Sequence, residues 1–160
     1  MCIPRERCLQ NTIYFLLNGK VKVSSIEHPN TIFEQAQFIL QPVGSTVEFQ
    51  MQEATECILF LFEAPENVCN TRFDIGISNA EMETPGPIVM DICPPLQDFI
   101  KGLKAYLNDD MLCSSLMQAK RTELVYLLNC YYPIKLLTQF YAPIYSYNRK
   151  FRYFVMQNYL

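Results

Sequence analysis

The sequence predicts an α+β protein in which an antiparallel β-sandwich or small barrel precedes a helical hairpin and two short helices. Two observations carry this prediction. Short β-rich runs recur about every ten residues in the first half, with turn residues between them. After Cys93 the apolar residues change to helical spacing. The change divides the chain into a β domain, residues 1–92, and a helical segment, residues 93–160.

Strands are expected where an apolar or alternating run lies between turn residues. The run 13–17 leads into an Asn18-Gly19 pair, and the alternating run 20–25 comes next. An Asn-Gly pair between such runs is the strongest short signal for a β-hairpin. The continuous apolar run 57–62 suits a central strand that is buried on both faces. The first ten residues are expected to be a loose lead-in. Further strands are expected at 31–33, 38–40, 46–51, 72–77 and 88–92.

The helical hairpin begins after a Pro-Pro pair at 94–95, which suits a helix entrance because a missing N–H costs little there. A polar stop at 108–110 ends its first helix. A Ser-Ser pair at 114–115 offers an N-cap for the second helix, and Pro133 ends it. The apolar stripes are Leu96, Phe99, Ile100, Leu103 and Leu107, and then Leu116, Ala119, Leu124, Leu127, Leu128 and Tyr131. The two short helices are expected at 134–141 and after Asn148.

Charge is distributed unevenly over the 160 residues, whose net charge is −3. Residues 1–92 contain five basic and twelve acidic side chains, a net −7, whereas residues 93–160 contain eight and four, a net +4. The second half has no Arg/Lys cluster at base-reading spacing, so its charges are interpreted as solvated helix faces. Its many aromatic residues repeat at helical spacing among Leu and Val, which favours core packing over base stacking.

The histidine and cysteine content argues against a metal site. His28 is the only histidine, and beside Pro29 it is expected to be an exposed turn residue, whereas small β-barrel metalloenzymes need two or three histidines. The seven cysteines form no CxxC pair, so reduced thiols in a cytoplasmic protein are expected. No phosphate-binding, dinucleotide-binding or nucleophile-elbow motif occurs. We therefore expect no catalytic residue, no cofactor, no metal and no enzymatic activity.

The helical half carries the pattern YL…C…K..EL…YYP…F..P…F..FV. Its residues are 103–107, Cys113, 120–124, 131–133, 140–143 and 151–155, and weaker matches in the β domain are 18–21, 37–45 and 57–62. In these segments the chain resembles the N-terminal regulatory region of AraC-type bacterial transcription regulators, in the style found in Bacteroidetes.

This resemblance implies a cupin-like β domain that senses an effector, and a helical dimerisation and linker segment. In the family, two helix-turn-helix units come next, and this sequence ends where they begin. The chain also stops inside an apolar helix, which we interpret as a cut from a longer protein. DNA is then expected to be bound only through that missing region, by a homodimer. Whether the parent activates or represses, and at which operator, is open.

Candidate site residues derive from this interpretation. A ligand is expected in the interior of the β-barrel, which looks apolar and does not identify an effector. Its candidate residues are Phe38, Leu40, Phe49, Phe60 and Phe62. A dimer interface is expected on the helices, because the second helix has apolar groups off its main line. The candidate interface residues are Tyr106, Val125, Tyr126 and Asn129.

Two alternatives remain open at this stage. One is a cupin-type small-molecule-binding protein or enzyme with no transcriptional role, although the single histidine disfavours the enzyme. The other is a scaffold or interaction domain that binds no ligand. No apolar stretch reaches the roughly 18 residues of a membrane span, and no signal peptide is seen, so no membrane contact is expected.

Overall fold

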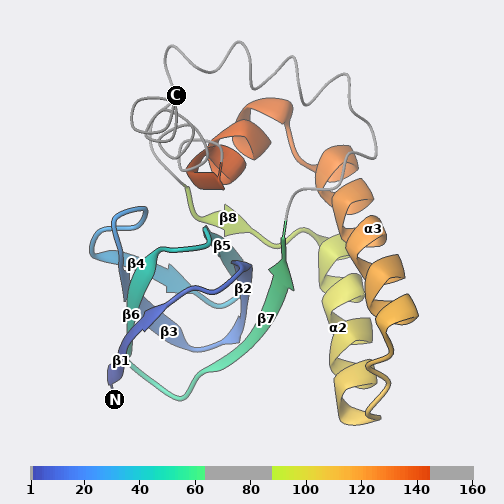
Figure 1. Ribbon diagram of the computed structural model, residues 1–160, viewed down its shortest axis with the longest axis horizontal. Coiled ribbons are helices and arrows are strands. Elements are labelled where there is room, and N and C mark those ends of the chain that lie inside the picture. Colours follow the sequence, from blue (N-terminus) through green and yellow to red (C-terminus); the bar gives the residue numbers. More distant parts are fainter. Residues whose placement is uncertain (1, 64–87, 145–160) are drawn as a thin grey trace, which may run out of the picture.

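The computed structural model describes residues 2–63 and 88–144 (Figure 1). The strands precede the helices in the chain. The strands are β1 (Cys2–Arg7), β2 (Asn11–Asn18), β3 (Lys20–Ser24), β4 (Thr31–Glu34), β5 (Gln37–Gln41), β6 (Thr46–Met51), β7 (Glu56–Phe62) and β8 (Met90–Asp91). The helices are α2 (Pro94–Asn108) and α3 (Ser114–Tyr131), followed by a helical stretch over 134–144.

The strands form two antiparallel sheets of four, with the orders β1-β6-β3-β4 and β7-β2-β5-β8. Each pair of neighbouring strands in these sheets is antiparallel. This arrangement confirms the α+β class and is consistent with a cupin-like sandwich. The expected strand at 72–77 and the last expected helix lie outside the described residues. The expected loose lead-in is wrong, because β1 pairs with β6.

The Asn18-Gly19 pair is a corner between the two sheets, so the expected β-hairpin is wrong. Strand β2 is paired on one edge with β5 and on the other with β7. It therefore has no edge left for β3, which pairs with β4 and β6 in the other sheet. Gly19 has φ +95°, a conformation that glycine adopts without a steric penalty.

Two apolar cores lie on the two faces of the β7-β2-β5-β8 sheet. The inner core fills the space between the sheets and contains Cys8, Leu16, Val21, Val23, Phe33, Ile39 and Val47. The outer core lies between this sheet and the helices, and its strand residues are Ile13, Phe15, Phe38, Leu40, Ile58, Phe62 and Met90. Successive strand residues point to opposite faces, so one strand supplies both cores.

Strand β7 does not have two buried faces, as the apolar run 57–62 had suggested. Ile58 and Phe62 are buried in the outer core, but Leu59 and Leu61 are 51% and 44% exposed. The reason is that β7 stands at the end of its sheet in the described structure, where the strand lacks a neighbour on one side.

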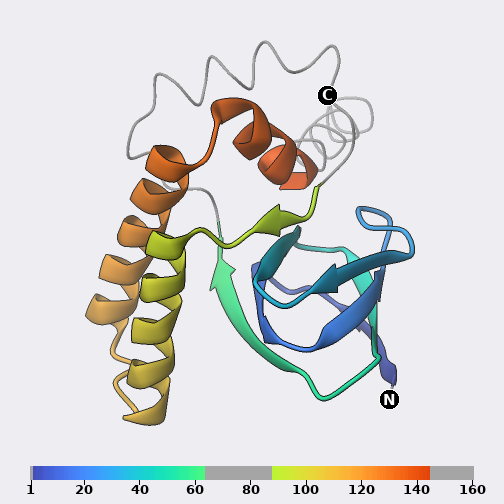
Figure 2. The same cartoon turned by 180° about the vertical axis from the view of Figure 1, so that it is seen from behind.

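The helices cover the outer face of the β7-β2-β5-β8 sheet. Figures 1 and 2 show α2 and α3 side by side next to β7, with the stretch 134–144 near β8. The buried helical residues are Leu96, Phe99, Ile100, Leu103, Leu124, Leu128, Leu137, Phe140, Tyr141 and Ile144. Leu107, the last residue of the expected stripe, is exposed. Within the described part of the chain, no helix combines the length and apolar character that crossing a bilayer requires.

Aromatic and polar contacts fix the helices on the sheet. The ring of Phe38 lies 5.1 Å from that of Phe140 and 5.8 Å from that of Tyr132, measured between centroids. The Tyr132 hydroxyl donates to the carbonyl of Asp91 at 2.7 Å and accepts from the N–H of Cys93 at 2.9 Å. The end of α3 is therefore joined to the segment between β8 and α2.

Replacing Gly19 with alanine should lower the free energy of unfolding by about 2 kcal/mol. The new Cβ would lie 2.5 Å from the Ala54 carbonyl oxygen and 2.8 Å from Oγ1 of Thr55, at a φ that alanine rarely adopts. Urea unfolding measures the change. The matched control is Gly102→Ala in α2, where a Cβ meets nothing within 4 Å. There, alanine should add about 0.5–1 kcal/mol through its helix propensity. A Gly19→Ala protein as stable as the wild type would contradict this account.

Candidate functional site

A cavity of about 310 Å³ lies between the β domain and the helices, and we call it the seam cavity. Its residues come from β2 and the position before it, from β7 and the position after it, from α3, and from the stretch 134–144. The apolar lining consists of Ile13, Phe60, Phe62, Leu124, Val125 and Tyr141, and the polar lining of Gln10, Glu63, Gln118 and Arg121. Polar and apolar groups make up the wall in nearly equal shares, so the cavity can contact both the apolar body and a polar group of a small molecule.

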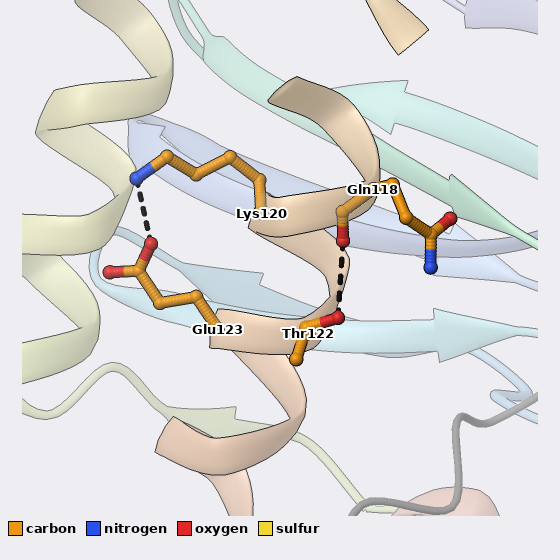
Figure 3. A network of polar contacts seen from close by, with 4 residues as sticks. All are labelled: Gln118, Lys120, Thr122 and Glu123. Atoms are coloured by element: carbon orange, nitrogen blue, oxygen red, sulfur yellow. Dashed lines mark hydrogen bonds and ion pairs between the residues drawn. The ribbon is translucent and has the colours of Figure 1, made fainter. Parts of the chain in front are cut away.

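One face of α3 supplies the helical side of the seam cavity. Gln118, Arg121 and Val125 are spaced three and four residues apart, which places them on the same side of the helix. Figure 3 shows the side chain of Gln118 pointing to the opposite side of α3 from Lys120 and Glu123. The face toward the cavity is therefore separate from the face toward α2.

Lys120 fixes the rotation of α3 against α2. Its ammonium lies 5.5 Å from the ring centroid of Phe99 and 5.2 Å from that of Tyr106, both on α2. The same ammonium pairs with the carboxylate of Glu123 at 2.7 Å (Figure 3). A cation held over two aromatic faces in a mostly buried position is a favourable contact. It keeps the Gln118 and Arg121 side of the helix turned toward β7.

Among the described residues that line the seam cavity, Arg121 alone is cationic. It is half-buried, and no carboxylate of residues 2–63 or 88–144 lies within ion-pair distance of its guanidinium. Sequence reasoning did not single out Arg121 or Gln118. Gln118 and Arg121 are three residues apart, which predicts that they lie on one side of α3, next to the apolar stripe of Leu124 and Leu128. This spacing does not predict which strand lies opposite them.

The buried side chain of Asn11 holds the strand end beside the cavity. Its Nδ2 donates to the carbonyl of Glu63 at 2.7 Å, and its Oδ1 accepts from the N–H of Val43 at 2.9 Å. Asn11 is 1% exposed, so both groups are satisfied away from water. These bonds fix the end of β7, and with it Phe62 and Glu63, at the rim of the cavity.

Four of the five expected ligand residues do not lie in the barrel interior. Phe38, Leu40, Phe60 and Phe62 point to the outer core, toward the helices, and only Phe49 packs in the inner core. The two-residue period of the strands decides this, because these four share one face of their sheet. Phe60 and Phe62 do line the seam cavity. That these five residues contact a ligand stays a prediction.

The expected interface residues do not share one face. Val125 lines the seam cavity, and Tyr106 lies under Lys120 between the helices. Tyr126 is 45% exposed, and Asn129 is half-buried. Tyr126 lies in a separate groove of about 450 Å³ on the outer side of α3, which we call the outer groove. It is lined by Ala119, Thr122, Glu123, Tyr126, Leu127, Cys130 and Tyr131. Dimerisation itself stays a prediction.

His28 is buried, which corrects the expectation of an exposed turn residue. Its side chain is among the largest fully buried ones, and its Nε2 lies 3.3 Å from the Leu40 carbonyl, to which it can donate. Nearby, the Gln41 amide donates to Ser25 Oγ at 3.1 Å. Burial lowers the pKa of His28, while the Leu40 carbonyl and Glu27 oppose that shift. Buried polar groups need partners, and this turn supplies them.

The inner core contains thiols that remain protonated near neutral pH. Burial raises the pKa of Cys57 to about 12 and raises that of Cys8 as well. Burial is also the main cause of the raised pKa of Tyr14, whose hydroxyl bonds with the Cys8 thiol. In residues 2–63 and 88–144, no three His, Cys, Asp or Glu side chains are grouped so that they could hold a metal ion.

Six chains of solved structures are similar to this chain, among them the two described below. No family model matches the chain, and no curated protein matches it. A DUF861-family protein from Thermotoga maritima is 21% identical, with a TM-score of 0.34, over 36% of this chain and 66% of that chain. A mutant of Bacillus subtilis oxalate decarboxylase is 11% identical, with a TM-score of 0.30, over 61% of this chain and 32% of that chain. This chain thus spans less than two thirds of each.

The prediction that this chain is not an enzyme is contradicted by the second comparison, because the similar chain is a decarboxylase. The prediction rests on one histidine and on missing motifs, and neither excludes chemistry by other side chains. A likeness at this identity and TM-score names no reaction for this chain, so none is assigned.

The stability of the fold should decrease as pH falls below about 6.5, in part because of His28. The folded state lowers the pKa of the ring, so the unfolded chain binds the proton more readily in that range. Urea unfolding at several pH values between 8 and 5 measures the slope. In His28→Gln the slope should be smaller, since the amide can still donate to Leu40 but does not titrate. Identical slopes in the two proteins would show that the ring is not held neutral.

Proposed function

We propose that this chain is a ligand-sensing and dimerisation module, as its resemblance to the regulatory region of AraC-type transcription regulators implies. The observation that carries the proposal is the position of the seam cavity, which is lined by strands β2 and β7 and by α3. A molecule bound there touches the sheet and the helix at once. It therefore favours the packing of α3 on the sheet that fits it best.

Coupling between ligand binding and the position of α3 requires contacts between the helices and the sheet. Leu124 and Leu128 of α3 pack in the same outer core as Ile13 and Phe62, and Lys104 of α2 pairs with Glu56 of β7. A ligand shifts such packing only by its difference in affinity between the two arrangements. In the longer cytoplasmic regulator that we propose, a DNA-binding region after this segment responds to the shift.

A small-molecule-binding protein with no transcriptional role would use the same cavity. The two functions differ in the region of the gene product that comes after the helices. A helix-turn-helix region encoded directly after Leu160 supports the regulator, and its absence from the gene would leave only the binding role.

A compound that binds in the seam cavity should raise the melting temperature of the wild-type protein, because it binds only the folded state. The test is a thermal-shift screen of sugars, aromatic acids and lipids. Val125→Trp places a larger side chain in the cavity and should abolish the shift. The matched control is Ile32→Trp, at an exposed position of β4, which should keep it. If no compound stabilises the wild type, or if Val125→Trp responds equally, the proposal fails.

We propose the outer groove as the surface that pairs with a second copy. It offers a small residue, Ala119, two turns before a large exposed one, Tyr126. A two-fold axis near 122–123, with α3 antiparallel to its copy, would set each Tyr126 beside the other copy's Ala119. The pairing of Glu123 with Lys120 reduces the repulsion between the two Glu123 carboxylates near this axis.

Tyr126→Lys should convert the dimer into a monomer, because a charged side chain would then face the apolar groove of the partner copy. Light scattering on a size-exclusion column, at high micromolar concentration, gives the mass directly. The control Ile26→Lys changes a residue that is 92% exposed and far from α3 in sequence, and should leave the mass unchanged. A monomeric wild type at this concentration, or a dimeric Tyr126→Lys protein, would refute the surface.

A further inference from the structure

We infer that the seam cavity binds an amphipathic monocarboxylate, with its anionic end at Arg121 and its apolar body against Phe60, Phe62 and Leu124. The inference rests on the proposed function, because it specifies the chemical class of the ligand for that cavity. It goes beyond that function because sensing alone does not require any particular charge.

The charge of the ligand is set by Arg121. Arg121 lines the cavity and is half-buried, and no carboxylate of the described residues lies within ion-pair distance of its guanidinium. A guanidinium presents two parallel N–H groups that match the two oxygens of a carboxylate. Gln118 lines the cavity one turn earlier on α3, so this side of the cavity is polar. An anionic group is therefore the complement of this end.

The apolar body of the ligand is set by the opposite lining. Phe60 and Phe62 are alternate residues of β7 on one face of the strand, and Leu124 faces them from α3. Burying an aliphatic or aromatic group between such walls is favourable in proportion to the area removed from water. The volume of about 310 Å³ lies at the small end of ligand sites, which selects a short chain or a single ring.

Glu63 restricts the ligand to one negative charge. Glu63 is an exposed residue at the rim of the same cavity, so a second carboxylate or a doubly charged phosphate would lie near a like charge there. Like charges that are close together in a partly desolvated site repel more strongly than in water. The cavity should therefore discriminate against dianions of the same size.

The test compares phenylacetate and hexanoate with their uncharged amides, phenylacetamide and hexanamide, by thermal shift and calorimetry. The two carboxylates should stabilise the wild type more than the amides, and phenylmalonate, which is a dianion at neutral pH, should bind more weakly than phenylacetate. Arg121→Gln should weaken the binding of the carboxylates about tenfold or more. It should leave the weak binding of the amides unchanged.

Arg7→Gln is the matched control, because it removes the same charge from an exposed position of β1 in the other sheet. It should bind the carboxylates like the wild type. If Arg121→Gln does not fold, Arg121→Lys and the comparison of carboxylate with amide in the wild type still test the charge. Equal binding of acids and amides, unchanged binding by Arg121→Gln, or equal loss in Arg7→Gln would overturn the inference. So would a failure of the carboxylates to bind while other compounds in the screen do, although the proposed function would then stand.

Discussion

The rest of the molecule depends on the packing of helices against the outer face of the β7-β2-β5-β8 sheet. Phe38 shows how close this packing is, since its ring meets Phe15 within the sheet, Phe140, and Tyr132 at the end of α3. The expected boundary at residues 92 and 93 therefore runs through one continuous apolar core. The seam cavity at the edge of that core is bounded by both parts, so a molecule bound there would contact the sheet and the helices.

Local patterns predicted the elements better than their partners. The two-residue and helical periods place most strands and both long helices, because burial on one face produces those periods directly. The corner at Gly19 was not predictable in this way, since a positive φ fits a hairpin and a sheet crossing equally well. Whether β2 has an edge left for β3 is decided by β5 and β7, which are distant in sequence.

The same limit applies to the candidate site. The apolar stripe through Leu124 and Leu128 identifies the buried side of α3. The sequence does not show that the neighbouring side, which carries Arg121, lies opposite β7. His28 was expected in solvent because its neighbours are turn residues. It is buried because the Leu40 carbonyl lies within reach of its ring, and no local pattern reveals such a contact. A site formed by segments that are distant in sequence can therefore be identified only once the fold is known.

The two hydrogen bonds of the Tyr132 hydroxyl close the chain from Cys93 to Tyr132 into a ring. The helices α2 and α3 are thus joined at the β8 end as well as by their covalent turn, and both connections oppose their separation. A movement of the helices on the sheet is then expected to carry both of them together, about a pivot at the β8 end. α2 has 15 residues and is therefore about 22 Å long. A rotation of about 5° at the pivot would displace the far turn by about 2 Å, over this length of helix.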